Sequence, residues 1–240
     1  MKIIAAIPAR YDARRFPGKL LADLCGKPVI QHTYEKVHQS GLFDRVIIVT
    51  DSDEIASVVK GFGGDVIRSQ KEHDCGSDRI AEAVLNLNAD IVINVQGDEP
   101  FIRPEGLSSL IEIFKSDQNK DIDLASLMIP ITEEINNPNV VKVITDLSNR
   151  ALYFSRSVIP HQRNQENHAT VYKHVGVYAF RKNALIDFYQ HDATPLEEAE
   201  KIEAIRYLEM GKTIQMVETQ FEGVGIDTVE DLERAKKLMT

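Results

Sequence analysis

Positive charge is concentrated in one short stretch near the start of this acidic chain. Residues 8–19 read PARYDARRFPGK and hold one acid, Asp12, and four basic side chains, Arg10, Arg14, Arg15 and Lys19. The whole chain has a formal net charge of −9 at pH 7. Arginine and lysine side chains, together with backbone N–H groups, bind phosphates. A local basic loop in an acidic protein therefore indicates a site for a small anion.

This loop departs from the common nucleotide-binding signatures. The stretch FPGK at 16–19 looks like the end of a P-loop, but the earlier glycine is missing and Leu20 stands where Ser or Thr would hold magnesium. No G-x-G-x-x-G follows the first apolar run. Gly18 beside Lys19 favours a ligand site, because glycine lets a ligand approach the backbone closely. From these residues alone, a solvated surface loop stays open as the alternative.

Two aspartates are candidates for holding a divalent metal. Asp98 lies in QGDEP (96–100), directly after the apolar run DIVINV (90–95). Magnesium prefers one or two carboxylates together with phosphate oxygens of a substrate, and Asp98 suits that role. Asp227, in GVGIDT (223–228), is a candidate second ligand. The structural alternatives are a turn or helix N-cap for Asp98 and the start of the last helix for Asp227.

Further polar candidates lie in the second half of the chain. Arg156, in YFSR, suits a bidentate contact with a carboxylate. A lone histidine such as His174 has a structural role more often than a catalytic one. Glu203 and Arg206 are three residues apart in a predicted helix, so the residues alone favour a local ion pair over a site.

The first half of the chain alternates apolar runs with segments of helical periodicity. Strands are predicted at 2–7, 45–50, 65–68 and 90–95, and helices at 28–41, 52–63, 76–87 and 104–116. This order predicts the α/β class, with a parallel sheet wrapped by helices. Ligands bind at the carboxyl ends of such strands, where the strand order reverses. The basic loop and QGDEP each follow a strand there, so they are expected to be neighbours in space. Ser77 or Asp78 is expected to cap the helix at 76–87.

The second half is richer in strands. Strands are predicted at 124–131, 140–146, 151–160, 172–180 and 213–218, helices at 197–211 and 228–239, and a polar connector at 161–171. The composition does not shift enough to mark a linker. We therefore expect a single domain over 1–240, with a β-rich lobe at about 124–180.

Composition narrows the class of protein. The 240 residues are 43% hydrophobic, enough for a globular core. No apolar run approaches the roughly 20 residues that span a bilayer, and the start MKIIAAIPAR lacks the long apolar region of a secretory signal. A cytoplasmic protein with no membrane insertion is expected. Cys25 and Cys75 are expected to be reduced thiols. The acidic balance argues against a nucleic-acid polymer as partner.

Several stretches together resemble the 3-deoxy-manno-octulosonate (Kdo) cytidylyltransferases, also called CMP-Kdo synthetases. In chain order they are IPARYDARRFPGK, GSDRIAEA, INVQGDEP, NPNVVKVI, ALYFSRSVIP, KHVGVYAF, IRYLEMG and GIDTVEDLERAK. They run along essentially the whole chain. The resemblance implies a Rossmann-like three-layer sandwich of the nucleotide-diphospho-sugar transferase type. It also implies the reaction CTP + Kdo → CMP-Kdo + diphosphate in lipopolysaccharide biosynthesis, a magnesium ion, and a homodimer formed through the β-rich lobe, especially 124–160.

The resemblance also implies roles for individual residues. Contacts with CTP fall to Ala9, Arg10, Lys19, Ser77, Arg79 and Gln96. Of these, Arg10 and Lys19 would bind the triphosphate, and Ser77, Arg79 and Gln96 would recognise cytosine and ribose. Magnesium would be held by Asp98 and Asp227, which with Lys19 make up the catalytic set. Contacts with Kdo fall to Arg156, His174, Tyr178 and Glu203. Arg14 is expected to be solvated, and Arg15 is a further candidate for phosphate.

Two positions depart from the family pattern. Ala204 stands where the family commonly has Gln, so a contact with a sugar hydroxyl is lost and a modified sugar such as 8-amino-Kdo is an alternative substrate. Cys75 stands where a Ser is usual, which weakens one hydrogen bond near the base.

Three alternative functions stay open. One is the same chemistry on a sialic acid or an alcohol phosphate. Another is a non-catalytic nucleotide-binding regulator with this fold, because a fold alone does not fix function. The third is a glycosyltransferase, whose Asp-x-Asp signature has a near match only in DSD at 51–53, where a helix cap is expected.

Overall fold

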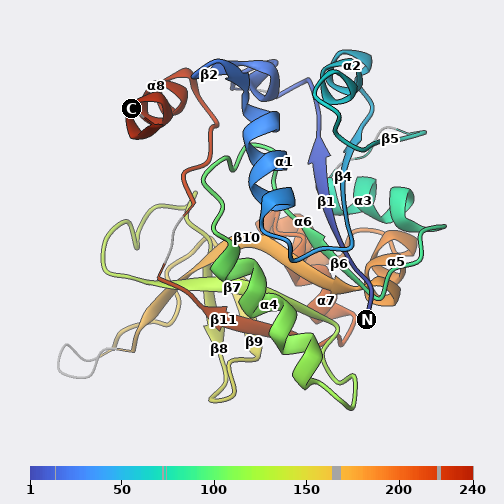
Figure 1. The fold of residues 1–240 in the computed structure, drawn as a ribbon. Coiled ribbons are helices and arrows are strands. Elements are labelled where there is room, and N and C mark those ends of the chain that lie inside the picture. The colour runs from blue at the N-terminus through green and yellow to red at the C-terminus, as the bar shows by residue number, and fades with distance from the viewer. Residues whose placement is uncertain (14, 72, 74, 164–168, 221–222, 240) are drawn as a thin grey trace. The chain divides into compact units, whose positions relative to one another are not determined.

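The computed structural model describes residues 1–240 except 14, 72, 74, 164–168, 221–222 and 240 (Figure 1). Arg14 and part of the predicted connector at 161–171 therefore lie outside the described residues. Contacts divide the chain into two compact units, Met1–Leu107 with Gly223–Thr240, and Ser108–Glu222. We call these the first and the second unit and describe each by itself. The single domain with a β-rich lobe at about 124–180 stays a prediction.

Four parallel strands form the sheet of the first unit. They are β1 (Ile3–Ala9), β4 (Arg45–Thr50), β5 (Val66–Arg68) and β6 (Ile91–Asn94), in the order β6-β1-β4-β5. Each neighbouring pair is parallel. Their side chains are mainly β-branched or small, and β1, β4 and β6 are almost wholly buried. Such continuous apolar runs are typical of parallel strands covered on both faces.

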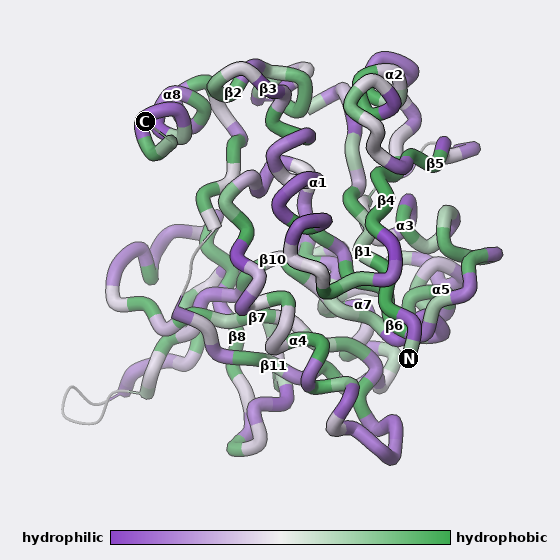
Figure 2. The backbone as a smooth tube through the Cα atoms, viewed as in Figure 1, coloured by the Kyte–Doolittle hydropathy of each residue, from purple (hydrophilic) through white to green (hydrophobic). Residues whose placement is uncertain are grey.

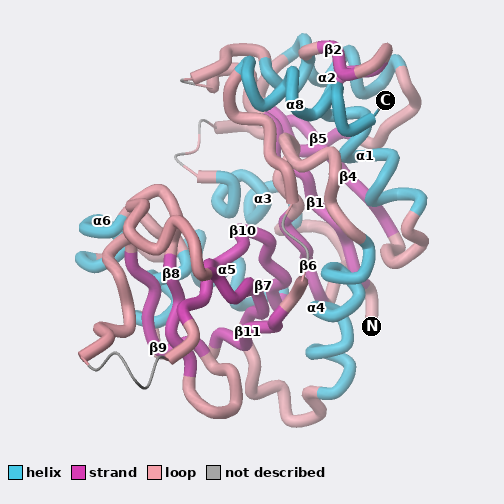
Figure 3. Tube along the Cα trace, turned by 90° about the vertical axis from the view of Figure 1, so that its left-hand side faces the viewer, coloured by secondary structure: helices cyan, strands magenta, loops and turns pink. Residues whose placement is uncertain are grey.

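The strand order of this sheet reverses between β1 and β6. From β1 the chain passes through α1 (Val29–Gln39) to β4 and through α2 (Asp53–Gly61) to β5. It then returns through α3 (Gly76–Val84) to β6, on the other side of β1. Because parallel crossovers are right-handed, the return places α3 on the face opposite α1, as Figure 3 shows. The carboxyl ends of β1 and β6 therefore meet at the switch point, where ligands bind in such sheets.

Short elements complete the first unit. The basic loop ends in a 3₁₀ turn, η1 (Lys19–Leu21), which leads into the hairpin of β2 (Asp23–Leu24) and β3 (Lys27–Pro28). The last helix is α8 (Val229–Met239), and the boundary between the units falls in α4 (Pro104–Ser116).

The start of α3 corrects one expectation. The helix begins at Gly76, so Ser77 and Asp78 lie inside its first turn and the N-cap is Cys75. The thiol of Cys75 accepts a hydrogen bond from the backbone N–H of Asp78 at 3.5 Å, the bond that a Ser or Asp cap would make. The prediction that Ser77 or Asp78 caps this helix was wrong, because cysteine was not considered as a cap.

The second unit has a mostly antiparallel sheet. Its centre is β7 (Leu124–Ile131), which pairs antiparallel with β10 (Val171–Arg181) and parallel with β11 (Ile214–Glu218). The hairpin of β8 (Lys142–Thr145) and β9 (Ala151–Ser155) joins through β8 to β10. Strand β9 ends at Ser155, earlier than the predicted end at 160, because the next residues turn toward Glu200. The Glu200 carboxylate accepts from Ser155 Oγ at 2.6 Å and from the Arg156 N–H at 2.9 Å.

The helical segments of the second unit differ from expectation in two places. The predicted helix at 197–211 is two helices, α6 (Pro195–Glu200) and α7 (Ala204–Glu209), broken where Lys201 takes a left-handed φ of +53°. The break exposes the carbonyls of Glu200 and Lys201 to the Arg156 guanidinium, which donates to them at 2.7 and 3.3 Å. Helix α5 (Lys182–Gln190) was not predicted; it follows β10 directly, and its N-cap Arg181 makes no side-chain cap.

Hydrophobic residues follow the strands, and polar residues follow the outer helices. Figure 2 shows this contrast between the hydrophobic strands β1 and β4 and the more hydrophilic α8. The pattern is that expected for a parallel sheet buried beneath amphipathic helices. Within the described part of the chain, every helix is too short or too polar to cross a lipid bilayer.

We predict that a buried ion pair stabilises the α6–α7 region. Arg206, 7% exposed, donates to both carboxylate oxygens of Glu197 at 2.6 and 2.7 Å and to the carbonyls of Phe188 and His191 at 3.2 and 3.0 Å. Arg206→Met should lower the free energy of unfolding in urea by about 3 kcal/mol or more, because it leaves the buried carboxylate of Glu197 without its charged partner.

Lys115→Met is the matched control for Arg206→Met. Lys115 pairs with Glu112 on the surface of α4, with both side chains more than half exposed. Its substitution should change the free energy of unfolding by less than about 1 kcal/mol. Equal losses for the two variants would contradict the stabilising role of the buried pair.

Candidate functional site

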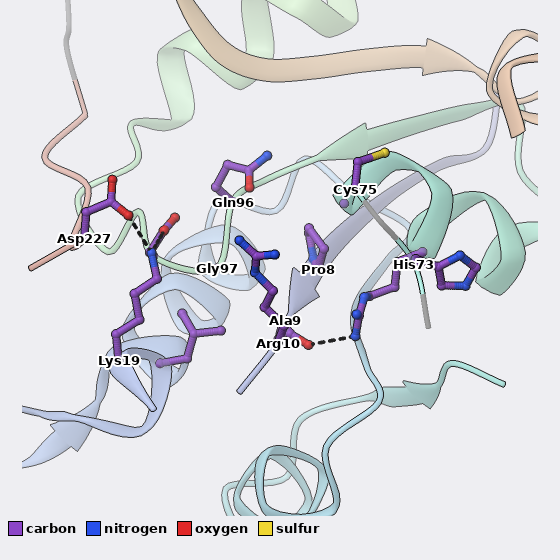
Figure 4. Close-up of a pocket in the computed structure, with 13 residues that line it drawn as sticks. Pro8, Ala9, Arg10, Lys19, His73, Cys75, Gln96, Gly97 and Asp227 are labelled. Atoms are coloured by element: carbon purple, nitrogen blue, oxygen red, sulfur yellow. Dashed lines mark hydrogen bonds and ion pairs between the residues drawn. The ribbon is translucent and has the colours of Figure 1, made fainter. Parts of the chain in front are cut away.

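A cavity of about 220 Å³ lies at the switch point of the first unit (Figure 4). The described residues that line it come from the end of β1, η1, the start of α3, and the loops after β6 and before α8. They are Pro8, Ala9, Arg10, Lys19, Leu20, His73, Cys75, Gly76, Arg79, Gln96, Gly97, Asp98 and Asp227. All the residues predicted to contact CTP or the metal line this cavity except Ser77. The basic loop and QGDEP therefore share one cavity, as their positions after β1 and β6 predict.

The loop after β6 passes very close to the end of β1. A Cβ atom on Gly97 would come within 3.0 Å of the Pro8 carbonyl oxygen, so only glycine fits there without a shift of the backbone. The Gly97 carbonyl in turn accepts from Thr33 Oγ1 of α1 at 3.0 Å. This close approach sets Asp98 beside the basic loop.

The loop before α8 is fixed to the same place. The N–H of Ile226 donates to the Asp98 carbonyl at 2.9 Å, which brings Asp227 next to Asp98. The start of α8 does not use the Asp227 side chain. Thr228 Oγ1 accepts from the N–H of Asp231 at 3.2 Å, and the Asp231 carboxylate accepts from the N–H of Thr228 at 3.0 Å. The Asp227 carboxylate is therefore available to the cavity.

Lys19 joins the two aspartates. Its ammonium donates to Asp98 Oδ2 and, at 2.8 Å, to Asp227 Oδ1, as Figure 4 shows for Asp227. The left-handed φ of +70° at Gly18 starts the turn that aims Lys19 inward. Burial lowers the pKa of Lys19, but the two carboxylates outweigh burial, so its pKa is raised above the ordinary value. Lys19 is therefore fully cationic at neutral pH.

Arg15 extends this cluster toward solvent. Its guanidinium lies 2.7 Å from Asp227 Oδ2, the oxygen that Lys19 does not take. Both side chains are about half exposed or more. Ion pairs at such exposure contribute little to stability. The pair therefore leaves Arg15 able to exchange Asp227 for another anion.

Arg79 and Gln96 line the cavity, and their side chains also form hydrogen bonds with other residues of the protein. Arg79 is 4% exposed, and its guanidinium donates to the Ala9 carbonyl at 3.3 Å and to Asp51 Oδ2 at 2.6 Å. The hydrogen bond from Arg79 holds the pKa of Asp51 below its usual range. Gln96 Nε2 donates to Asn94 Oδ1 at 3.4 Å. Arg79 thus fixes the end of β1, in addition to facing the cavity.

Two further sequence expectations for this region have clear outcomes. Ser77 is fully buried in α3; it directly follows Cys75 and Gly76, which line the cavity, but does not line the cavity itself. The DSD stretch at 51–53 contains the helix cap that was expected, because Ser52 accepts from the N–H of Ile55 at 3.2 Å. Cys75, which the family pattern placed near the base, lines the cavity; His73 and Leu20 were not named as site residues, yet they line it too. Only their position beside the GSDR and FPGK stretches could have indicated them.

The four predicted sugar contacts lie in the second unit. Arg156 follows β9, His174 and Tyr178 are in β10, and Glu203 is the N-cap of α7. The Arg156 guanidinium donates to the carbonyls of Glu200, Pro138 and Lys201. These bonds use three of its five N–H groups, so two remain for a ligand. Arg206, expected to pair locally with Glu203, makes its bidentate pair with Glu197.

His174 is buried in an aromatic cluster. Its ring lies edge-on to Phe154, with 4.9 Å between centroids, and 5.3 Å from the ring of Tyr178. Its Nε2 is 3.0 Å from Ser126 Oγ. Burial lowers the pKa of His174 to about 4, so the imidazole is neutral at pH 7. A neutral imidazole hydrogen-bonds its neighbours and carries no charge to a ligand.

Sequence reasoning missed Lys142, the most unusual side chain of the second unit. It is fully buried, and its ammonium donates to the carbonyls of Asn137, Val140 and Arg156 at 3.1, 2.7 and 2.5 Å. Burial lowers the pKa of Lys142; Glu200 raises it, and Arg156 lowers it further. The ammonium thereby ties the 137–140 turn to the backbone of Arg156. Its only sequence signal was its place in the stretch NPNVVKVI.

Comparison with protein families and curated proteins gives consistent matches. Residues 4–214 match the family described as Cytidylyltransferase. A protein of Christiangramia forsetii named 3-deoxy-manno-octulosonate cytidylyltransferase is 57% identical over 241 residues, covering 100% of this chain and 97% of that protein. A protein of the same name from Geobacter metallireducens is 43% identical, covering 98% of this chain and 96% of that protein.

Solved structures match over the whole chain as well. A CMP:2-keto-3-deoxy-manno-octonic acid synthetase complexed with CTP has a TM-score of 0.94 and 39% identity, covering 100% of this chain and 98% of the other. A 4-diphosphocytidyl-2C-methyl-D-erythritol synthase from Anaerococcus prevotii has a TM-score of 0.66 and 17% identity, covering 99% and 98%, which supports the fold alone. The predicted α/β class with a mostly parallel sheet is confirmed by these matches; a dimerisation lobe is not part of what they show.

We predict that His174 makes stability depend on pH. Its pKa of about 4 in the folded protein lies below the ordinary value of 6.5. Between pH 6.5 and about 4, the imidazole is therefore protonated in the unfolded chain but neutral in the folded protein. Stability is therefore fully present above pH 6.5 and falls by about 3 kcal/mol as the pH drops to about 4. Urea unfolding of the protein and of His174→Gln at pH 7.5, 5.5 and 4.5 measures this contribution. The variant should show a smaller loss, and identical pH dependences would contradict the buried neutral imidazole.

Proposed function

Because the chain belongs to the family of 3-deoxy-manno-octulosonate cytidylyltransferases, we propose that it transfers the cytidylyl group of CTP to Kdo and releases diphosphate. The observation that carries the proposal is the cluster of Lys19, Asp98 and Asp227 at the switch point. It joins a cation for phosphates to carboxylates for a metal, in a chain that matches a CTP-bound synthetase along its whole length. CTP is a cytoplasmic metabolite, and we expect the protein to act there.

The basic loop supports the binding of the triphosphate. Arg10 and Lys19 line the cavity, with Gly97 offering backbone that a ligand can approach closely. Lysine binds phosphate as a point charge, and arginine binds it through its planar fork. We assign Arg10 and Lys19 to the triphosphate, and Ala9, Arg79 and Gln96 to the remainder of CTP. The assignment of Ser77 to cytosine and ribose stays a prediction, and its side chain is fully buried in α3.

The carboxylate pair fits magnesium. Asp98 and Asp227 hydrogen-bond the same ammonium, so oxygens of both face one point that a cation already occupies. Among the described residues no group of three or more His, Cys, Asp or Glu side chains is gathered at one point. A pair of carboxylates completed by phosphate oxygens is the set that magnesium prefers. When bound, magnesium would neutralise charge on the phosphates and lower the pKa of the attacking hydroxyl.

The proposed chemistry is an in-line displacement at the α-phosphorus. The anomeric hydroxyl of the sugar loses its proton to solvent, and its oxygen forms the new bond to the α-phosphorus. The bond from phosphorus to the bridging oxygen breaks, and diphosphate leaves with that electron pair. Such a transfer needs positioning and charge stabilisation more than covalent help from the protein. Lys19 and Arg10 stabilise the negative charge that builds on the leaving diphosphate.

The four residues assigned to the sugar differ in how well their side chains can contact a ligand. We assign Arg156 to the sugar carboxylate, through the two N–H groups that its carbonyl partners leave. His174 and Tyr178 are 8% and 5% exposed, so any contact with hydroxyls is limited to a small part of each ring. Glu203, at the start of α7, is partly exposed. Ala204 is fully buried, and its methyl side chain offers no polar group to a sugar hydroxyl. The amino sugar 8-amino-Kdo therefore stays an alternative substrate.

Diphosphate release from the purified protein with CTP and magnesium tests the proposal. Kdo, 8-amino-Kdo and N-acetylneuraminic acid are compared as acceptors, with ATP, GTP and UTP in place of CTP as controls. Release with CTP and Kdo supports the proposed reaction. Release only with the amino sugar moves the assignment to that substrate. No release with any acid sugar favours a nucleotide-binding regulator.

We predict that Asp98→Asn lowers the turnover of CTP and Kdo by roughly 100-fold or more, because a ligand of the proposed metal loses its charge. The shape of the side chain is kept, so the fold should persist, as circular dichroism would check. Asp53→Asn is the control: its carboxylate is 95% exposed on α2, and turnover should be unchanged. Near-normal turnover of Asp98→Asn would remove this residue from the metal site.

We also propose a homodimer, formed through the β8–β9 hairpin of the second unit. Leu147 in the turn of the hairpin, Leu152 in β9 and Val158 three residues after β9 are 107%, 57% and 38% exposed, an unusual set of apolar side chains on one short segment. Among the described strands β9 forms a ladder only with β8, and beside its start there is the isolated bridge of Arg150 with Gln215, so most of its other edge has no strand partner. Burial of these side chains against a second copy would remove them from water.

We predict that the double variant Leu147→Asp, Leu152→Asp is monomeric by light scattering at concentrations where the unsubstituted protein is a dimer. Two carboxylates in an apolar interface are costly to desolvate. Leu238→Asp is the control, because Leu238 is 59% exposed on α8 of the first unit. A dimer that survives the double substitution, or an unsubstituted protein that is monomeric, would contradict this interface.

A further inference from the structure

Lys19 occupies the place that a metal held by Asp98 and Asp227 would need. Its ammonium hydrogen-bonds Oδ2 of Asp98 and Oδ1 of Asp227 at the same time. The Lys19 side chain is 11% exposed, whereas the carboxylates are 25% and 47% exposed. The second oxygen of Asp227 pairs with Arg15 at 2.7 Å. The chain thus supplies its own cations to both carboxylates.

The ammonium and a divalent cation cannot share these oxygens. Two carboxylates close together repel each other and need a positive charge between them. Lys19 meets this need, so a metal entering the site would gain less than it would from two open carboxylates. It would also stand within a few ångströms of the ammonium, where repulsion between cations is strong in a partly buried site. Either the ammonium or the metal holds the pair.

A triphosphate offers Lys19 a stronger partner. It carries more negative charge than the two carboxylates, and lysine, on a flexible stem of four carbons, can turn from one anion to another. The cavity beside Lys19 is lined by Arg10 and Gly97, so a phosphate bound there lies within reach of the ammonium. Movement of the ammonium to the phosphate would leave oxygens of Asp98 and Asp227 facing each other without their cation.

We propose that Lys19 is a displaceable cation that keeps divalent metal off Asp98 and Asp227 until a nucleoside triphosphate draws its ammonium away. The inference rests on the proposed function and describes how its metal site is regulated. The two ligands then favour each other in both directions, because binding linkage is reciprocal. The carboxylates stay neutralised and ordered in the free protein, and the metal site forms only together with its nucleotide.

The test measures the binding of Mn²⁺ alone, without nucleotide, by electron paramagnetic resonance of the free ion. Lys19→Met should bind Mn²⁺ at least about tenfold more tightly than the unsubstituted protein, a gain of the usual size for a coupling between two sites. Lys19→Arg keeps the charge and should bind as weakly as the unsubstituted protein. Asp98→Asn added to Lys19→Met should abolish the gain, which locates it at this pair of carboxylates.

Lys27→Met is the matched control. It removes one positive charge from another ion pair, with Glu35 at 2.6 Å on α1, and therefore tests the effect of net charge alone. Its affinity for Mn²⁺ should equal that of the unsubstituted protein. Equal tightening by Lys27→Met and Lys19→Met would overturn the proposal. Circular dichroism checks each fold, and Lys19→Gln replaces Lys19→Met if that variant does not fold.

Two other outcomes separate this inference from the proposed function. Equal Mn²⁺ affinity of Lys19→Met and the unsubstituted protein, lost on Asp98→Asn, overturns the displacement and leaves the metal site in place. No Mn²⁺ binding by Lys19→Met overturns both the displacement and the use of Asp98 and Asp227 as ligands. Release of diphosphate from CTP and Kdo, measured separately on the unsubstituted protein, decides the proposed reaction independently of either result.

Discussion

One ammonium group organises the cavity of the first unit. Lys19 Nζ bonds to Asp98 and Asp227, which lie 79 and 208 residues away from it in the sequence. Three separate loops must meet at one point for this cluster to form. They meet because the strand order reverses between β1 and β6 and because the N–H of Ile226 binds the Asp98 carbonyl. The charge cluster therefore depends on the topology of the sheet. The same topology brings two carboxylates close together, and Lys19 neutralises their negative charge.

The cavity is arranged before any ligand arrives. Arg79 is held by Ala9 and Asp51, and Gly97 by Thr33. Fixed donors and charges of this kind need little reorganisation when a ligand binds, which is what stabilisation of a reacting phosphate requires. Binding then consists of exchanging protein partners for ligand partners. The groups with exposed partners, Arg15 and Asp227, exchange most easily, and the buried Arg79 least.

The sequence predicts the continuous periodic segments of both units. The runs at 45–50, 104–116 and 124–131 coincide with β4, α4 and β7, because each is a continuous periodic segment bounded by polar residues or proline. The cluster of Lys19, Asp98 and Asp227 was also predicted in place, from strand ends and family motifs. The break at Lys201 was not, because it depends on carbonyls turning toward Arg156, a residue distant in sequence. Helix α5 was missed because it lacks a side-chain cap, and the cap of α3 because cysteine rarely serves as one.

Two lysines show why residue type alone does not decide function. Lys19 and Lys142 are both largely buried, and both ammonium groups have several partners. The partners of Lys19 are carboxylates, which raise its pKa, whereas those of Lys142 are backbone carbonyls, and burial lowers its pKa. A carboxylate can be exchanged for a phosphate, since both are anions that compete for one cation. A backbone carbonyl is fixed by the fold and has no such competitor. Lys142 is therefore bound into the architecture, while Lys19, with the same side chain, remains free to change partners.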